Sequence, residues 1–428
     1  KISNHDIAVI AINGRFPQVE NMDQFWQLLV ENKNAIGKFP ADKIHPSVLS
    51  EDVNNKNYVF ASGELKDADS FDYNFFGINK QEAESVDPQQ RKFLELSYET
   101  FEMAGYNTVQ MKNNRIGVFA SMGPSKYSQI VSMYPDKARS LGEHYLQMGL
   151  DKDYLATKIA YKLNLKGPAL NVNTACSSSL VSVINAVESL RSGFCDMALA
   201  GGVSIRSTPL SGHLFNEGGI LSSSEQCRPF DQNADGTIFT DGIGMVLLKR
   251  LDQAQRDGDF IWAVIKGVGL NNDGADKMNY MAPSLEGQAQ VISQALADAD
   301  VSAESISYVE AHGTATPVGD PIEFAALKKV YERYGDKKNY CVLSSVKSNI
   351  GHANSAACIS GFIKAVLSLH KGIIPGTVHF KNVNANIDLK NSPFIITNEN
   401  RPFVYNMTQE NNDKAKSGEN NTEELNRS

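Results

Sequence analysis

One cysteine lies in a sequence that is typical of a nucleophile. Residues 169–172 are a short apolar run, and Cys176 follows it where a helix is predicted to begin and to continue to about Arg191. At a helix start, unpaired backbone N–H groups and the positive end of the helix dipole favour a thiolate. We therefore expect Cys176 to be a nucleophile with a lowered pKa, the plainer alternative being a buried structural thiol. The other cysteines have no such setting and are interpreted as packing residues: Cys195, Cys227, Cys341 and Cys358.

Two of the eight histidines could handle protons for this thiol. His312 lies in the segment EAHGTAT at 310–316, and His352 ends the segment KSNIGH at 347–352, each after a strand-like run. Side chains at the carboxyl ends of strands in an α/β layer point into the crevice where ligands bind. Either histidine alone could be a hydrogen-bonded structural residue. With Cys176, and with glycines beside both, a Cys-His-His site is the better interpretation.

Other site types fit the sequence poorly. The segment 231–236 resembles the first half of a calcium loop, but the twelfth position is Gly242 where a glutamate is needed, which predicts a turn-rich loop. Gly267 and Gly269 begin a dinucleotide fingerprint that Asn272 breaks. Five scattered cysteines without CxxC spacing argue against structural zinc and a disulfide framework.

The elements that would position these residues alternate between strands and helices. Strand-like runs separated by helical stretches occur at 7–12, 116–120, 168–172, 197–200, 243–249, 260–268, 305–309 and 341–346. The segments 186–193 and 365–372 align at an offset of 179 residues with five of eight pairs identical. Both lie in apolar helices that begin with small residues, so we expect a duplicated α/β architecture with a buried central helix pair.

Composition narrows the class of protein. The 428 residues are 42% hydrophobic and 21% charged with a net charge of −8, and no basic stripe with interleaved aromatics occurs, which argues against nucleic acid as a partner. No window of about 18 apolar residues and no charged-then-apolar leader occur, which argues against membrane spanning and export and predicts a cytoplasmic protein. Residues 406–428 are almost wholly polar and are predicted to form a mobile loop or tail.

The motifs resemble those of the β-ketoacyl synthases of the thiolase-like group, specifically the ketosynthase domains of modular polyketide synthases. TACSSSL at 174–180, EAHGTATPVGDPIE at 310–323 and KSNIGH at 347–352 occur in the family's order, and the resemblance runs from Asp6 to about Phe403. It implies a duplicated βαβαβαβ core in α-β-α-β-α layers with buried central helices. Residues 1–255 would carry the nucleophile and 256–405 both histidines, followed by the tail at 406–428.

The resemblance also implies residue roles. Cys176 would accept the acyl chain, while His312 and His352 would bind the malonyl thioester carbonyl and assist decarboxylation. Thr314 and Thr316 match positions that contact the phosphopantetheine arm of an acyl carrier protein, which delivers the substrates, so that no bound cofactor or metal is expected. Lys347, Glu323 and Asn349 would support the site.

The activity implied is acyl transfer to Cys176 and decarboxylative Claisen condensation with a malonyl-type unit. Expected partners are an acyl carrier protein, neighbouring synthase domains in a longer polypeptide and a second copy of the chain, with 117–121 and 168–174 as candidates for a two-fold interface. The alternative is a non-elongating module that only passes acyl chains on or serves as a scaffold. A thiolase acting on coenzyme A thioesters is a weaker third choice, because no second active-site cysteine lies near a glycine-rich turn.

The chain departs from the family pattern in several places. Ala315 and Cys358 replace glycines, Asn354 replaces a glutamate, and Thr240-Asp241 replaces Gly-Glu. The loss of a carboxylate at 354 could weaken the support of His352. The family's glycine-rich closing strand, which carries the second oxyanion donor, does not occur in the sequence. We expect it to follow Ser428 in the native polypeptide, with 406–428 as an inserted loop.

Overall fold

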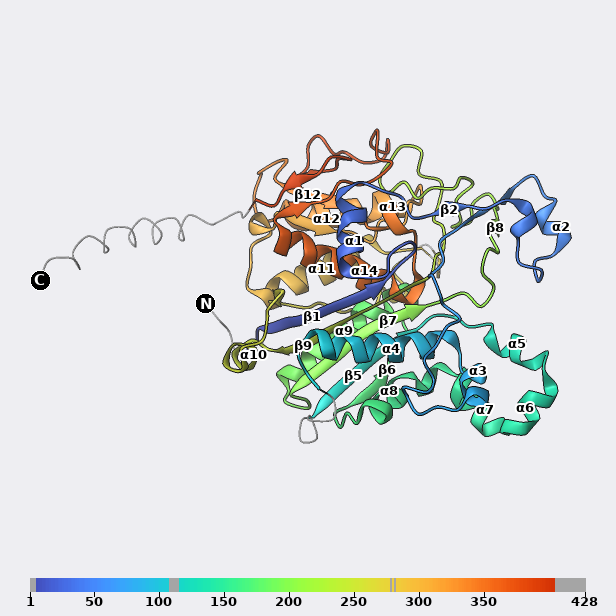
Figure 1. Cartoon of the computed structure of the whole chain (residues 1–428). Coiled ribbons are helices and arrows are strands. Elements are labelled where there is room, and N and C mark those ends of the chain that lie inside the picture. Colours follow the sequence, from blue (N-terminus) through green and yellow to red (C-terminus); the bar gives the residue numbers. More distant parts are fainter. Residues whose placement is uncertain (1–4, 108–114, 278, 281, 405–428) are drawn as a thin grey trace, which may run out of the picture.

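The largest sheet has six strands and supports the candidate site. The computed structural model describes residues 5–107, 115–277, 279–280 and 282–404. Six strands follow the order β10-β1-β9-β7-β5-β6, in which β5 runs parallel to β6 and β7 while β9 is antiparallel to β1 and β7 (Figure 1). Their bounds are β1 (Ile7–Arg15), β5 (Ile116–Met122), β6 (Ala169–Asn171), β7 (Met197–Ser204), β9 (Gly242–Arg250) and β10 (Ala263–Ile265). The long strands are buried along almost their whole length, which explains their continuous apolar runs.

A smaller parallel sheet carries the histidine segments. Its order is β11 (Tyr308–Glu310), β12 (Cys341–Ser344) and β14 (Phe394–Ile395). Helices α11 (Leu285–Ala299) and α12 (Gly319–Tyr331) pack against it through one hydrophobic cluster. Three two-stranded pairs lie outside both sheets: β2 (Gly37–Lys38) with β4 (Ala61–Ser62), β3 (Tyr58–Val59) with β8 (His213–Leu214), and β13 (Ile373–Ile374) with β15 (Arg401–Pro402).

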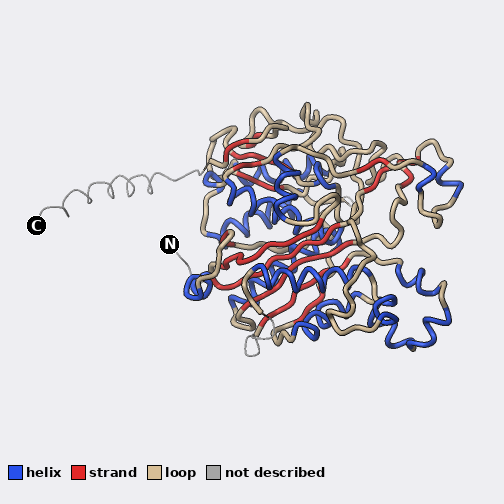
Figure 2. The backbone as a smooth tube through the Cα atoms, in the orientation of Figure 1, coloured by secondary structure: helices blue, strands red, loops and turns tan. Residues whose placement is uncertain are grey.

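Two helices are buried between the sheets. One face of the large sheet packs against α4 (Pro88–Met103) and α8 (Leu155–Leu163), and the other face packs against α9 (Ser178–Arg191) and α14 (Ala357–Lys371). Helix α14 also contacts β11 of the small sheet. The sheets and helices therefore alternate as α-β-α-β-α layers, as the sequence predicts (Figures 1 and 2).

The two central helices are those of the predicted repeat, and their first turns meet. The Ile359 N–H donates to Ser179 Oγ at 3.0 Å. A Cβ on Gly202 of β7 would lie 2.9 Å from Ser179 Cβ and 2.7 Å from the Ser355 carbonyl oxygen, so the sheet and both helix starts are in close contact there. The packing thus requires a glycine at 202 and leaves little room beside Ser179.

The remaining helices lie around the core. They are α1 (Met22–Val30), α2 (Ser50–Val53), α3 (Lys80–Ser85), α5 (Tyr127–Ser132), α6 (Pro135–Leu141), α7 (Glu143–Leu150), α10 (Leu251–Asp257) and α13 (Lys347–Ile350). Short 3₁₀ turns occur at η1 (Ala41–Lys43), η2 (Lys152–Tyr154), η3 (Ala175–Ser177), η4 (Ala303–Ser305) and η5 (Asn354–Ala356). Turns η3 and η5 directly precede α9 and α14 and belong to the site.

Two expectations are revised or left open by the fold. The predicted interface at 117–121 is wrong, because β5 is buried inside the sheet with β6 and β7 on its two sides. Strand β10, from the second half of the chain, pairs with β1 of the first half. The predicted tail at 406–428 lies outside the described residues. Among the described residues, no helix has the length and apolar composition needed to cross a membrane.

Candidate active site

Cys176 lies in a strained turn between β6 and α9. It occupies the middle of η3, and the preceding Ala175 has a φ of +56°, a left-handed conformation that L-residues rarely adopt. The predicted lowering of its pKa is wrong: burial raises the pKa of the Cys176 thiol, while the Lys347 charge and the cysteine's own N–H oppose that rise. Helix α9 begins at Ser178, and the desolvation of the thiol outweighs the stabilisation of the thiolate.

Cys358 contacts the backbone of Cys176, the predicted nucleophile, so the interpretation of Cys358 as a packing residue is incomplete. Its thiol donates to the Cys176 carbonyl oxygen across 3.3 Å. It also lines a cavity of about 330 Å³ together with His312 and Lys347. Burial raises the pKa of Cys358 to about 11. No local spacing indicates this contact, because the two cysteines meet only through the packing of α9 and α14.

The two predicted histidines come together. Their ring centroids are 5.7 Å apart and the rings are perpendicular. His352 is 2% exposed, and its backbone N–H donates to the Ile238 carbonyl at 2.8 Å while its ring packs 4.9 Å from Phe239. The Asn354 N–H donates to His352 Nδ1 at 3.0 Å, so a neutral His352 ring carries its proton on Nε2. The ring is therefore fixed as an Nε2–H donor.

Both imidazoles are held in the neutral form. The Lys347 ammonium is the main cause that lowers the pKa of His312, and partial desolvation of the ring adds to it. Burial, then Lys347 and His312, hold the pKa of His352 well below its ordinary value. The side chain of His312 is exposed to solvent at the cavity, which screens the lysine charge in part. The direction nevertheless favours neutral N–H donors in both rings.

The backbone of His312 is held from two sides by groups that the sequence predicted. Glu323 accepts from the His312 N–H at 2.6 Å through Oε1 and from the Gly313 N–H at 2.8 Å through Oε2. The Lys347 ammonium, 2% exposed, donates to the His312 carbonyl at 2.5 Å. Glu323 and Lys347 therefore position His312 through its main chain.

The loop after His312 contains one departure from the family pattern, at a position that favours glycine. Ala315 is buried with a φ of +62°, where a glycine would be unstrained. Its N–H donates to Asp320 Oδ1 at 3.1 Å, and the Phe230 N–H donates to Oδ2 at 2.7 Å. Burial raises the pKa of Asp320 to about 7. Asp320 is not among the predicted site residues, although it lies in the motif at 310–323.

The two predicted threonines lie beside each other on the same loop. Thr314 Oγ1 and Thr316 Oγ1 are 3.3 Å apart, and Thr316 Oγ1 accepts from the Gly319 N–H at 3.2 Å. Both side chains are half-buried, which leaves hydroxyl surface for a ligand.

Asn349 and Asn354 act differently from expectation. The amide of Asn349 donates to the Lys33 carbonyl at 3.0 Å, so its side chain anchors the 33–35 loop. Asn354 holds His352 through its backbone N–H, which any residue supplies, so the missing carboxylate at 354 leaves this support in place. Asp241, at another departure, accepts from the backbone N–H groups of Arg206 and Leu65 at 2.9 and 3.2 Å.

The residues that resemble a calcium loop form a turn, as predicted. The Asp231 carboxylate already accepts from three backbone N–H groups, those of Asn233, Lys381 and Asn382. In the described part of the chain, no group of three or more histidine, cysteine or acidic residues could hold a metal ion.

An open cavity of about 810 Å³ lies next to the nucleophile turn. Ala175 and Ser178, which flank Cys176, form part of its wall, as do Asn354 and Ser355 from η5. Most of the other lining residues carry hydroxyl, amide or charged groups: Ser125, Ser128, Gln147, Asp151, Lys152 and Asn173.

The sequence is similar to polyketide synthases. Family models for the N-terminal and C-terminal domains of β-ketoacyl synthases match residues 4–254 and 262–381. A phenolphthiocerol/phthiocerol polyketide synthase protein of Mycobacterium tuberculosis is 40% identical over 94% of this chain, which covers 28% of that protein. Polyketide synthase PksM of Bacillus subtilis is 39% identical over 92% of the chain, which covers 9% of that protein. The chain thus spans a small part of each curated relative.

Solved structures agree with this likeness. Ketosynthase twelve of the bacillaene polyketide synthase from Bacillus amyloliquefaciens has a TM-score of 0.88 and 35% identity, covering 95% of this chain and 71% of that one. An oxazolomycin ketosynthase domain from Streptomyces albus has a TM-score of 0.85 and 30% identity, covering 95% and 71%. The thiolase-like fold is therefore confirmed, and the chain belongs to the β-ketoacyl synthase family of acyltransferases, among relatives that are polyketide synthase ketosynthases.

Proposed function

We propose that the chain is an elongating ketosynthase, which takes an acyl chain from an acyl carrier protein onto Cys176 and condenses it with a malonyl-type unit. The observation that carries this proposal is the pair of perpendicular imidazoles 5.7 Å apart, of which His352 is fixed as an Nε2–H donor. Acyl transfer alone has no need of two such donors.

In the first half-reaction, the Cys176 thiolate attacks the thioester carbonyl of the carrier-bound acyl group. The new C–S bond forms as the bond to the pantetheine sulfur breaks, and that thiolate takes up the proton which Cys176 lost. Because burial raises the pKa of Cys176, only a fraction of this thiol is ionised at neutral pH. The Lys347 charge increases that fraction.

In the second half-reaction, the malonyl thioester loses CO₂ and leaves an enolate. The N–H groups of His312 and His352 donate to its oxygen, where negative charge develops only as the reaction proceeds, so they stabilise the transition state more than the substrate. The enolate carbon then bonds to the acyl carbon on Cys176. The C–S bond breaks, and the Cys176 thiolate leaves and is reprotonated.

Substrate delivery is part of the same proposal. Thr314 and Thr316 would donate hydrogen bonds to the amide groups of a phosphopantetheine arm. Because this arm belongs to the carrier protein and delivers the substrates, the chain itself would need no bound cofactor. The 810 Å³ cavity beside Ala175 and Ser178 would receive the acyl chain. The carrier protein and neighbouring synthase domains are the partners expected for this chemistry.

The proposal also includes the division of the chain, its assembly and its location. The division of the chain into halves 1–255 and 256–405 places the nucleophile in one and both histidines in the other. The chain would form a homodimer through β6, the edge strand of the large sheet, where Leu170 is 49% exposed. The cytoplasmic location stays a prediction from composition.

Mass spectrometry distinguishes this function from the non-elongating alternative. After incubation with an acyl carrier protein bearing an acyl group, Cys176 should carry that group. Addition of the malonyl-loaded carrier should then remove it and yield a β-ketoacyl product. Acylation without any β-keto product would support a module that only passes acyl chains on. No acylation at all would contradict the proposed function and support a scaffold.

A further inference from the structure

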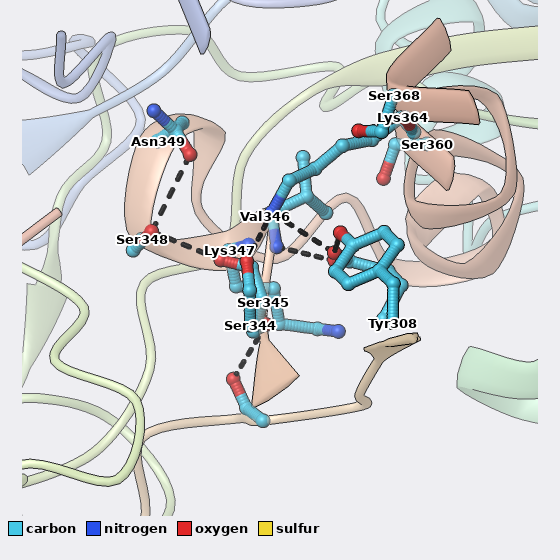
Figure 3. A network of polar contacts seen from close by, with 12 residues as sticks. Tyr308, Ser344, Ser345, Val346, Lys347, Ser348, Asn349, Ser360, Lys364 and Ser368 are labelled. Carbon is cyan, nitrogen blue, oxygen red and sulfur yellow. Dashed lines mark hydrogen bonds and ion pairs between the residues drawn. The ribbon is translucent and has the colours of Figure 1, made fainter. Parts of the chain in front are cut away.

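A buried charge pair lies behind the site, between α14 and the small sheet. Lys364 of α14 is 0% exposed, and its ammonium lies 2.9 Å from the Glu310 carboxylate and 2.5 Å from Ser344 Oγ. The Tyr308 hydroxyl donates to the same carboxylate. Figure 3 shows Lys364 extending from its helix toward Tyr308 and the segment that carries Val346 and Lys347. The two half-reactions proposed above use none of these groups directly.

The energetics do not explain this pair as a stabilising feature. Removing two charges from water costs several kcal/mol per ion, and apolar residues of similar volume often give equal or greater stability. Burial lowers the pKa of Lys364, and Glu310 opposes that shift. A buried pair of this kind can instead fix the relative positions of the segments that carry it. The contacts of Lys364 and Glu310 indicate which segments these are.

The pair joins the ends of two strands, from which both histidine segments depart. Glu310 is the last residue of β11, two residues before His312, and Ser344 is the last residue of β12. Glu310 Oε1 accepts from the Val346 N–H at 2.5 Å, while Oε2 contacts Lys364. The carboxylate therefore ties the start of the 345–352 segment to β11.

The tied segment in turn holds His312. Ser345 Oγ donates to the Gly313 carbonyl at 3.1 Å, and the Lys347 ammonium donates to the His312 carbonyl at 2.5 Å. On the other side, Gly361 of α14 leaves room for Glu310, since a Cβ there would lie only 3.1 Å from Glu310 Cγ. A continuous chain of contacts thus leads from Lys364 through Glu310 and Val346 to His312.

We propose that the Lys364–Glu310 pair positions His312 for condensation by holding Val346, and with it Lys347, in register against the histidine loop. This inference rests on the proposed function. Cys176 itself lies in η3, which the pair does not touch, and the Lys347 charge links it to the pair. Its acylation should therefore depend on the pair much less than condensation does. The pair is a positioning element and touches no reacting atom.

Two double variants test this without leaving a lone buried charge. Lys364→Met with Glu310→Leu removes both charges and the acceptor for the Val346 N–H. Lys364→Met with Glu310→Gln removes both charges but keeps an acceptor oxygen. Because a displacement of about 1 Å can cost about 100-fold in rate, the Leu variant should condense about 100-fold more slowly. Its Cys176 acylation should fall far less, and only through the rise in the pKa of Cys176 that a displaced Lys347 causes. The Gln variant should recover much of the condensation rate.

A matched control comes from another buried lysine in the same full chain. Lys249 is 5% exposed, with its ammonium 2.8 Å from Asp259, at the end of β9 opposite to the site. Lys249→Met should change stability but leave the ratio of condensation to acylation unchanged. An unaltered ratio in the Leu variant, or an equal fall in the Leu and Gln variants, would overturn the positioning role.

A second readout separates this inference from the proposed function. If wild type acylates but does not condense, the proposed function fails, yet the position of Lys347 can still be followed through NMR titration of His312. Displacement of the ammonium that lowers the pKa of His312 should raise that pKa in the Leu variant and not in the Gln variant. An unchanged pKa in the Leu variant would contradict the inference.

Discussion

The proposed nucleophile, Cys176, and the two histidines are held by different kinds of structure. Cys176 lies in a short turn after an edge strand, and the thiol of Cys358 contacts its carbonyl. His312 follows the end of strand β11. Its own main chain is hydrogen-bonded to the side chains of Glu323 and Lys347. The difference fits the proposed chemistry, in which the two histidine donors must meet one oxygen in a defined geometry.

The same comparison applies to electrostatics. Lys347 lowers the pKa of His312 and His352 and also opposes the rise in the pKa of Cys176. One buried ammonium therefore acts in the same direction on both regions, favouring neutral imidazoles and an ionised thiol. Substitutions of Cys176 and Lys347 should separate the role of the thiol from that of the Lys347 charge. A substitution at the edge of the large sheet tests the proposed dimer interface.

The largest effect is expected for Cys176→Ala, which removes the acyl acceptor. Self-acylation should be lost completely, while Cys195→Ala, a control at a buried thiol, should leave it unchanged. In wild type, iodoacetamide should modify Cys176 before Cys358, whose pKa burial raises to about 11. Peptide mass spectrometry checks both statements, and earlier modification of any other cysteine would contradict the assignment.

Lys347→Met should have the next largest effect, since it removes both a contact to His312 and the shared charge. We expect condensation at neutral pH to fall on the order of 100-fold. Loss of the positive charge raises the pKa of His312 and His352, so the acid limb of the pH–rate profile should move to higher pH. The pKa of Cys176 should also rise, moving the acylation profile to higher pH. Profiles that stay in place would show that Lys347 does not act on these groups.

A smaller effect concerns the edge of the large sheet. If β6 forms a two-fold interface, Leu170→Asp should weaken dimerisation about 10- to 100-fold, the loss expected for one buried leucine side chain. Tyr161→Asp, a change at a side chain that is 81% exposed on α8, is the control and should not matter. Sedimentation across micromolar concentrations measures both, and a wild-type monomer throughout that range would refute the interface.

The smallest effect tests strain at the nucleophile turn. Ala175 is exposed in a left-handed conformation, so Ala175→Gly should raise the free energy of unfolding by up to about 1 kcal/mol. Ala297→Gly, at an exposed position within α11, should lower it by about 1 kcal/mol. Urea unfolding measures the two changes. A loss of stability in Ala175→Gly would indicate that the turn is not strained.

Much of the fold could be predicted from local patterns. The apolar runs predicted the strands of the large sheet and two strands of the small sheet, β11 and β12, but not β14. The repeat at 186–193 and 365–372 predicted the central helices α9 and α14. Pairing of β10 with β1 could not be predicted, because strand partners are chosen by tertiary packing. The failure of 117–121 as an interface has the same cause, since an apolar strand has the same sequence pattern at an edge and inside a sheet.

The sequence predicted the proposed reacting residues of the candidate site, but it did not reveal several residues that hold them in place. Motif spacing predicted a site of Cys176, His312 and His352, and the structure brings the two histidine rings together. The roles of the three residues stay predictions. The Cys358 contact and the Lys364–Glu310 pair escaped detection, because their partners are far apart in sequence and carry no local signature. The pKa of Cys176 was expected to fall because the helix start was considered without the burial that accompanies it.

The most direct test of the account is single-turnover mass spectrometry of His312→Ala beside wild type, with acyl and malonyl carrier proteins added in turn. The account predicts that Cys176 of the variant is acylated at a rate near that of wild type. Subsequent release as a β-ketoacyl product should fall on the order of 100- to 1000-fold, the typical cost of one lost oxyanion donor. Condensation at the wild-type rate in His312→Ala would contradict the assignment of the histidine region to enolate stabilisation.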